Sequence, residues 1–282
     1  MSELPATDPR SEVFRGSMEE RFGVRHRISV PARRNGILST LIDRVNDSDE
    51  IYALWVGQNV NAVDRQAMSD HGPVHVQIVA NSALRLLRLL RDGGIQPSVV
   101  LDYGLTPADA EVVVVLAALF HDVGMSIHRD GHEAFSLFVA QPVLRSLLSE
   151  VYPPPSDTVI RNEILHAIIS HRGGGRPLTL EAGVLRIADA LDMAKGRSRI
   201  PFTAGSMSIH SVSAASIDAV HIEKGEATPV RIRIQMANSA GVFQVDQLLR
   251  DKLKGSGLET YLQIVAQIEG ETEKRIVETF QL

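Results

Sequence analysis

The sequence contains no cysteine, and this absence excludes two kinds of chemistry. Neither a disulfide nor a thiolate metal ligand is available in the 282 residues, so any bound metal must use imidazole, carboxylate or water. The first ten residues lack the apolar core of a signal peptide, and no apolar run reaches the roughly 20 residues of a transmembrane helix. We therefore expect a cytoplasmic protein that does not bind a membrane.

Aromatic residues and excess charge are also scarce. Aromatics form only 5% of the chain, whereas leucine, isoleucine, valine and alanine are abundant, which suits packed helices. The formal net charge of −5 gives no strong signal for nucleic-acid binding, because such binding usually needs a basic surface. A chain of this length forms one large or two small domains, and a homo-oligomer is compatible with its composition.

The spacing of apolar residues divides the chain into regions. Residues 1–35 are polar and interrupted by prolines, which favours an N-terminal arm of low order, with a strand at 24–30 as the alternative. Helical spacing then extends over 36–205. It includes a short helix that we expect to end at Gly57, and a helix that runs to His171 with Ser156 or Asp157 as its cap.

The pattern changes after residue 205. Apolar and polar residues alternate at 219–223, 230–236 and 261–268, which is the spacing of half-buried strands, and residues 243–253 have helical spacing. This predicts a strand–strand–helix–strand unit over 206–282, whose three strands would form a small antiparallel sheet. The expected fold class is mainly α, with a helical bundle followed by a small C-terminal α+β unit.

The most unusual pair of residues stands at the end of a long apolar run. Val112–Phe120 leads directly into His121 and Asp122, a nitrogen and an oxygen donor that together suit a divalent metal. The valines could form a strand. We predict a helix instead, because Thr106-Pro107 is a helix-start signal and the run is too long for a typical strand. Gly124 is expected to end this helix.

Other polar residues occur in similar apolar surroundings. His75 lies near the start of a predicted helix whose apolar positions are 76, 79, 83, 86, 87 and 90. Asp189 is embedded in the apolar segment 187–191, where an unpaired carboxylate would be costly to bury. His71 is either a turn residue before Pro73 or a further residue of the same pocket.

The order of these residues resembles the HD superfamily of metal-dependent phosphohydrolases. The segment that starts at His75 is similar to the family's first histidine motif, Ala118–Gly124 to its His-Asp motif, and Ile187–Asp192 to its last aspartate motif. The resemblance covers roughly residues 60–200 and implies an HD-domain-like helical bundle. Two positions depart from the family pattern: Met125 stands where many members have lysine, and Arg172 stands where the two-metal members have a second histidine.

The resemblance also implies a ligand set. It assigns one divalent metal to His75, His121, Asp122 and Asp189. His132 and His171 are the candidates for a second metal ion or for a general acid, and Asp122 is expected to accept a proton from the attacking water as well. The metal can be Mn, Fe, Mg, Co, Ni or Zn, with one or two ions bound.

Basic residues follow the histidine and aspartate motifs. We expect Arg172, Lys195, Arg197 and Arg199 to bind the phosphate of a phosphorylated small molecule, in particular a nucleotide. Arg197 or Arg199 should point into the metal pocket. The alternative is a solvated loop whose cations compensate a helix C-terminus.

These observations favour one function and leave two alternatives. The favoured function is hydrolysis of a nucleotide or another phosphoester by water that a His/Asp-bound metal activates. One alternative is a cyclic-nucleotide or dinucleotide phosphodiesterase. The other is a non-catalytic regulatory or assembly protein on the same scaffold, which the intact ligand set disfavours.

Overall fold

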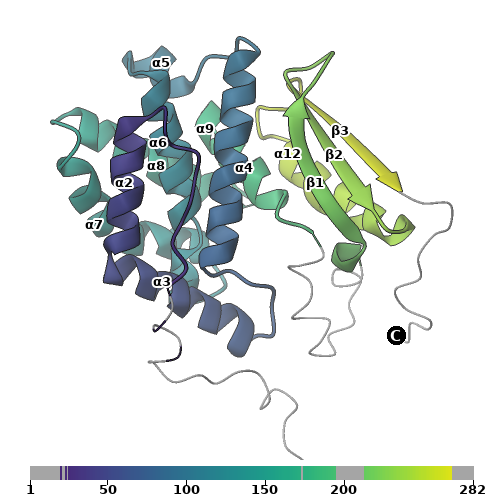
Figure 1. Ribbon diagram of the computed structural model, residues 1–282, viewed down its shortest axis with the longest axis horizontal. Helices are drawn as coiled ribbons and strands as arrows, with labels where there is room; N and C mark the ends of the chain where they lie inside the picture. The colour runs from purple at the N-terminus through teal and green to yellow at the C-terminus, as the bar shows by residue number, and fades with distance from the viewer. Residues whose placement is uncertain (1–19, 21–22, 24, 173, 195–212, 269–282) are drawn as a thin grey trace, which may run out of the picture.

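The computed structural model describes residues 20, 23, 25–172, 174–194 and 213–268. A bundle of helices lies beside a three-stranded sheet (Figure 1), so the expected fold class is confirmed. None of the described helices combines the length and apolar character of a membrane span. The predicted boundary near residue 206 lies outside the described residues. The elements of the bundle are α2 (Gly36–Asp47), α3 (Asp49–Asn59), η2 (Val60–Asp64), α4 (Pro73–Asp92), α5 (Ser98–Tyr103), α6 (Pro107–Phe120), η3 (Val123–Ser126), α7 (His132–Ser149), α8 (Ser156–Ser170) and α9 (Leu180–Ala190).

The C-terminal unit consists of a sheet and the helical segment that crosses it. Strands β1 and β2 pair antiparallel, and β3 pairs with β2 in parallel. The three strands are where the alternation predicted them, but the expectation of an antiparallel sheet is wrong for the third. The helical segment between β2 and β3 returns the chain to the end of the sheet where β2 starts, which is the connection that parallel strands need. The elements are β1 (Ile217–Lys224), β2 (Val230–Met236), η4 (Ser239–Gly241), η5 (Gln244–Leu249), α12 (Arg250–Leu253) and β3 (Leu262–Ile268).

The central helix of the bundle is α6. In its capping box, Thr106 and Asp109 each accept the other's backbone N–H. All side chains of Ala110–Phe120 are buried, as expected for a helix that is apolar around its whole circumference. The prediction of a helix is confirmed, and the strand alternative is wrong. The helix delivers His121 and Asp122 into the interior of the protein.

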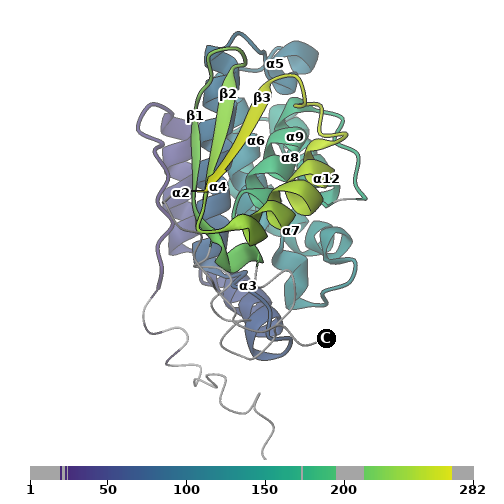
Figure 2. The ribbon, with the colours of Figure 1, turned by 90° about the vertical axis from the view of Figure 1, so that its right-hand side faces the viewer.

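Helix α4 lies between the rest of the bundle and the sheet (Figures 1 and 2). It packs against α6 and α9 and also contacts β1. All the apolar positions predicted for its inner face, 76, 79, 83, 86, 87 and 90, are buried. The inward side chains of β2 belong to the same continuous core as the helices. His75, in the first turn of α4, therefore faces the interior.

Residues 25–35 of the predicted arm run as an extended segment along α2 and α4 (Figure 1). Asn46 of α2 accepts from the backbone N–H of Ile28 at 2.7 Å and donates to its carbonyl at 2.9 Å. Ser29 N–H donates to Gln77 at 2.7 Å, and Asn81 donates to Ser29 O at 2.9 Å. Side-chain amides thus replace a neighbouring strand, so this part of the arm is neither a strand nor of low order.

Two predicted helix boundaries are wrong. Helix α3 does not end at Gly57 but continues to Asn59, because a glycine inside a helix costs only about 1 kcal/mol and η3 packs against this helix. Neither Ser156 nor Asp157 caps α8. Both belong to its first turn, and the residue before them, Pro155, offers no side-chain cap.

Candidate metal centre

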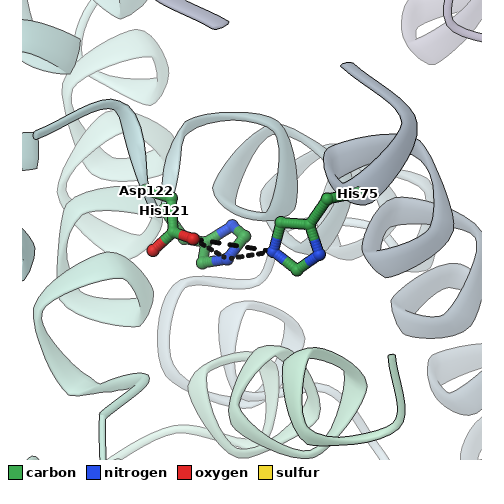
Figure 3. A group of neighbouring side chains, drawn as sticks. All are labelled: His75, His121 and Asp122. Carbon is green, nitrogen blue, oxygen red and sulfur yellow. Dashed lines mark hydrogen bonds and ion pairs between the residues drawn. The ribbon is translucent and has the colours of Figure 1, made fainter. Parts of the chain in front are cut away.

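Three helices bring together the four residues that the sequence assigned to a first metal. Figure 3 shows His75 of α4 facing His121 and Asp122 at the end of α6. Nε2 of His75 lies 3.3 Å from Nε2 of His121, and Asp122 Oδ2 lies 3.5 and 3.3 Å from these two atoms. Asp189 reaches the same place from α9, with Oδ1 3.8 Å from Nε2 of His75 and 3.7 Å from Nε2 of His121. The donor atoms of His75, His121 and Asp122 are close enough for a shared ion, and Asp189 forms a similar group with His121 and His171.

A second group of donors lies on the other side of Asp122. Its Oδ1 is 2.9 Å from Nε2 of His132 and 3.6 Å from Nε2 of His171. The two Nε2 atoms are 3.4 Å apart. Each oxygen of the Asp122 carboxylate therefore faces its own pair of imidazoles. The carboxylate would thus offer one ligand oxygen to an ion on either side.

The outer nitrogens of these histidines hold the rings in place. Nδ1 of His121 donates to Ala118 O at 2.8 Å and Nδ1 of His171 to Ile168 O at 2.6 Å. His132 does the same toward Arg129 O at 2.9 Å. Because a carbonyl oxygen can only accept, each Nδ1 must carry a hydrogen, and each Nε2 is the atom turned inward. Such outer hydrogen bonds are typical of histidines that bind metals.

The outer nitrogen of His75 contacts a carboxylate that was not predicted as a site residue. Asp192 Oδ2 lies 2.6 Å from Nδ1 of His75. It follows Asp189 by three residues, and a second acid at the end of an apolar helix was the signal that could have identified it. A carboxylate in this position fixes the ring and makes its inner nitrogen a better electron donor.

Gly124 does not end α6, whose last residue is Phe120. It lies in η3, where a Cβ atom would be 2.1 Å from His132 O and 2.4 Å from Ser136 N. Its role is to allow α7 to approach the His-Asp pair. Ser136 accepts from Gly124 N–H and donates to His121 O, both at 2.8 Å. The close contact is what brings His132 to the centre.

His71 lies beside the metal centre, so it is a residue of the pocket and not only a turn residue before Pro73. It is buried, its Nδ1 is 2.7 Å from Ser69 O, and its Nε2 is 3.9 Å from Asp122 Oδ2. Its ring lies next to that of His75. It is thus oriented like the other histidines but stands one step farther from the centre.

The two carboxylates of the centre remain ionised although they are buried. Burial raises the pKa of Asp122, but the charge and hydrogen bond of His121, with further hydrogen bonds from His132 and His75, lower it well below its ordinary value. Burial also raises the pKa of Asp189, and the charges of Lys252 and His121 outweigh that effect. Both side chains are therefore available as anionic ligands.

Two histidines of the centre differ in their protonation: His121 is protonated and His171 is neutral. Burial lowers the pKa of His121, but Asp122 and Asp189 outweigh it and raise this pKa to about 10. Burial, together with the charges of His121 and Lys252, lowers the pKa of His171 to about 3. The extra proton of His121 must lie on Nε2, the inward atom. A cation that binds there displaces it, so binding should release protons and strengthen as pH rises.

The predicted phosphate-binding residues are only partly described. Arg172 lies beside the second group of donors, with a nitrogen 3.4 Å from Glu133 Oε2, an atom that is itself 3.6 Å from His132 Nδ1. Lys195, Arg197 and Arg199 lie outside the described residues, so the expectation that Arg197 or Arg199 enters the pocket stays a prediction.

Comparison with known proteins identifies the family. A model of the HD domain matches residues 73–194, the stretch that contains every donor described above except His71. A relative from Methanocaldococcus jannaschii, named "Uncharacterized protein MJ1020", is 39% identical over 236 residues, which are 84% of this chain and 91% of that protein. The chain belongs to the HD superfamily of metal-dependent phosphohydrolases.

Proposed function

We propose that this protein hydrolyses a nucleotide or another phosphoester with the help of one or two divalent metal ions. The observation that carries the proposal is the position of Asp122, whose two oxygens each face a pair of imidazole Nε2 atoms. A buried anion surrounded by inward-turned nitrogens is stable only with a proton or a cation among them. Membership of the HD superfamily supports the cation.

The donor set suits a divalent ion of intermediate softness. Imidazole and carboxylate without thiolate fit Mn, Fe, Co, Ni and Zn, and carboxylate with water also admits Mg. The groups around His75 and around His132 each offer three donors and share Asp122, which favours two ions over one. When bound, such ions lower the pKa of a coordinated water and neutralise charge on a phosphoryl oxygen.

The residues of the chain would accept and donate the protons of the reaction. Asp122 is ionised and its carboxylate is central to both groups, so it can accept a proton from the attacking water. With one ion bound, His132 is the candidate to donate a proton to the leaving alkoxide. Nε2 of His171, which is neutral and buried, lies 3.4 Å from Nε2 of His132. With two ions bound, both histidines become ligands.

We also infer the partners from the same chemistry. A phosphorylated small molecule, in particular a nucleotide, would fit a centre that holds divalent ions, with Arg172 at its side. We retain the cytoplasmic location and a homo-oligomer as predictions. A cyclic-nucleotide or dinucleotide phosphodiesterase and a non-catalytic scaffold are outcomes of the test below.

The test starts with elemental analysis of protein purified without added metal. The protein is then loaded with Mn, Fe, Co, Ni, Zn or Mg and offered nucleoside mono-, di- and triphosphates, cyclic nucleotides and dinucleotides. We expect bound metal and turnover of at least one class, and loss of both in Asp122→Asn. Glu111→Gln, which changes another buried carboxylate of α6, is the matched control and should retain both. Metal binding without turnover of any phosphoester would favour the scaffold.

A further inference from the structure

A residue of the C-terminal unit reaches the metal centre. Lys252 belongs to α12, in the connection between β2 and β3, and α12 packs against α9 (Figure 2). Its Nζ donates to Asp189 Oδ2 at 3.0 Å and to the backbone carbonyl of His171 at 2.7 Å. A cation from the far end of the chain thus contacts two of the residues that line the centre.

The position of Lys252 is held by its neighbours. Arg186, one turn before Asp189 on α9, is buried and donates to Lys252 O at 2.8 Å and to Asp251 O at 3.3 Å. In the same region a Cβ atom on Gly183 would lie 2.3 Å from Ser256 O. The backbone of α12 is therefore fixed against α9 independently of the Lys252 side chain.

Lys252 is turned toward the accessible side of the centre. The side chains of His75, His121, Asp122, His132 and His171 are at most 5% exposed, whereas those of Asp189 and Lys252 are 17% and 19% exposed. A substrate can therefore approach the donors most easily beside Asp189. Any group that it brings there meets the Lys252 ammonium.

The ammonium group has one donor left for such a group. A lysine carries three N–H bonds, and the described residues accept only two of those of Lys252, at Asp189 and His171. An ammonium cannot itself ligate a metal. Asp189 Oδ2 is held by Lys252, while its Oδ1 faces the histidines. The lysine thus stands beside a candidate ligand without competing for the ion.

We propose that Lys252 binds a non-bridging oxygen of the substrate phosphoryl group with its third N–H. The inference rests on the proposed function, because it needs a phosphoryl group at the metal centre. It gives the C-terminal unit a part in substrate binding. A compact ammonium suits this task, since it offers a point charge to a phosphate.

The test measures binding of inorganic phosphate to the full-length protein loaded with stoichiometric Mn²⁺, by calorimetry, so that it does not depend on turnover. Lys252→Met should raise the Kd for phosphate about 10- to 100-fold, the effect of losing a hydrogen bond to a charged group. Lys252→Arg keeps the charge and should stay within about threefold of the wild type. Lys254→Met, at an exposed lysine two residues away, should change nothing. Mn²⁺ content is measured in every sample.

Several results would overturn the proposal. These are an unchanged phosphate Kd in Lys252→Met, an arginine variant as weak as the methionine one, or a wild type that does not bind phosphate. Loss of Mn²⁺ from Lys252→Met would also overturn it, because Lys252 would then act only by holding Asp189. If phosphate binding follows the expected pattern but no phosphoester is hydrolysed, the proposed activity fails while the phosphate contact stands.

Discussion

Two buried carboxylates, Glu111 and Asp122, lie near opposite ends of α6, and they differ in what neutralises them. Near the start of the helix, Glu111 accepts from Arg88 at 2.8 and 2.9 Å and from Asn35 at 3.2 Å, with Arg91 3.6 Å away. We call these four residues the Glu111 cluster. At the other end, Asp122 faces imidazoles alone among the described residues. Permanently charged arginines neutralise Glu111, whereas Asp122 depends on a proton or a metal ion bound among its imidazoles.

The pKa values express the same difference. Burial raises the pKa of Glu111, but hydrogen bonds from Arg88 and Asn35 and the charges of both arginines bring it below its ordinary value. The two arginines carry permanent charge. Asp122 depends on protonated His121 for the corresponding effect. A proton on Nε2 of His121 thus occupies the place of the metal, and removing it without supplying a metal would leave Asp122 poorly compensated, whereas Asp189 would keep its contact with Lys252.

The largest expected effect is that of Asp122→Ala. The variant should lose its metal and, with it, hydrolysis by at least on the order of 10³-fold, since metal activation of water and phosphate contributes several kcal/mol. It should also lose the increase in melting temperature that metal gives the wild type, because an ion at 100 times its Kd stabilises the folded state by about 2.7 kcal/mol. Elemental analysis, turnover and thermal unfolding with and without chelator measure these effects. Full metal content with normal turnover would make the His-Asp pair structural.

Glu111→Ala should lower the stability of the fold and leave metal binding unchanged. Removing the buried carboxylate leaves the half-buried Arg88 without its main partner, and we expect the free energy of unfolding to fall by about 1–3 kcal/mol. Metal affinity should not change, because the Glu111 cluster contacts none of the metal donors among the described residues. Chemical denaturation and Mn²⁺ titration are the measurements. The double variant Arg88→Met/Glu111→Leu should recover most of the lost stability. A metal affinity that falls with Glu111→Ala would show that the Glu111 cluster and the metal centre are coupled.

His171→Ala separates the two halves of the centre. The group formed by His75, His121, Asp122 and Asp189 stays complete, so the first ion should remain bound. Turnover should fall about 10²-fold, because the variant loses either a ligand of the second ion or a group near the departing alkoxide. Counting Mn²⁺ per protein distinguishes the two explanations: a decrease from two to one supports two ions, and an unchanged count of one supports the leaving-group role. Normal turnover would remove His171 from the site.

Asp192→Asn tests the support of His75. The amide keeps the shape of the side chain but not its charge, and losing such an outer carboxylate typically weakens metal binding about 10- to 100-fold. Competition with a chelator of known affinity measures the change. Asp251→Asn, at an exposed aspartate of α12, serves as the control. An unchanged affinity in Asp192→Asn would mean that packing alone holds the His75 ring.

The comparison also shows what sequence could predict. His121 and Asp122 stand out because an apolar helix ends on them, and Asp189 because it interrupts an apolar segment. These are local signals, and the structure brings all three together. Lys252 gave no local signal, since it is an ordinary lysine on a short helix 63 residues after Asp189. Only the packing of the C-terminal unit on α9 brings it to the centre.

Neither the direction of β3 nor the orientation of the His71 side chain could be predicted from the sequence. Alternation with a period of two predicted β3, but the same alternation fits either strand direction, and the crossing segment decides it. His71 precedes Pro73 in a turn, a context that suits a surface residue as well as a pocket residue. Its orientation depends on other parts of the fold: its backbone N–H donates to Asn59 at 2.9 Å, and its Nε2 lies 3.9 Å from Asp122 Oδ2. Such tertiary contacts leave no periodic trace.

The smallest effect concerns the pH dependence of the Glu111 cluster. Because the pKa of Glu111 is lower in the folded state than its ordinary value of 4.5, the folded protein binds its proton less readily than the unfolded chain does. The stability that the charged carboxylate contributes is therefore complete above about pH 4.5 and is lost as pH falls through the folded pKa. Glu111→Gln has no such proton to bind. The stability advantage of wild type over this variant should shrink on acidification, by no more than about 1.4 kcal/mol per pH unit for a single proton. Denaturant unfolding of both proteins, treated with chelator, measures this difference in steps of about half a pH unit between about pH 6 and pH 3.5. The titration of the metal centre cancels in the comparison, because both proteins share that centre. An advantage that stays constant or grows toward acid would mean that Arg88 and Arg91 do not stabilise the charged form of Glu111.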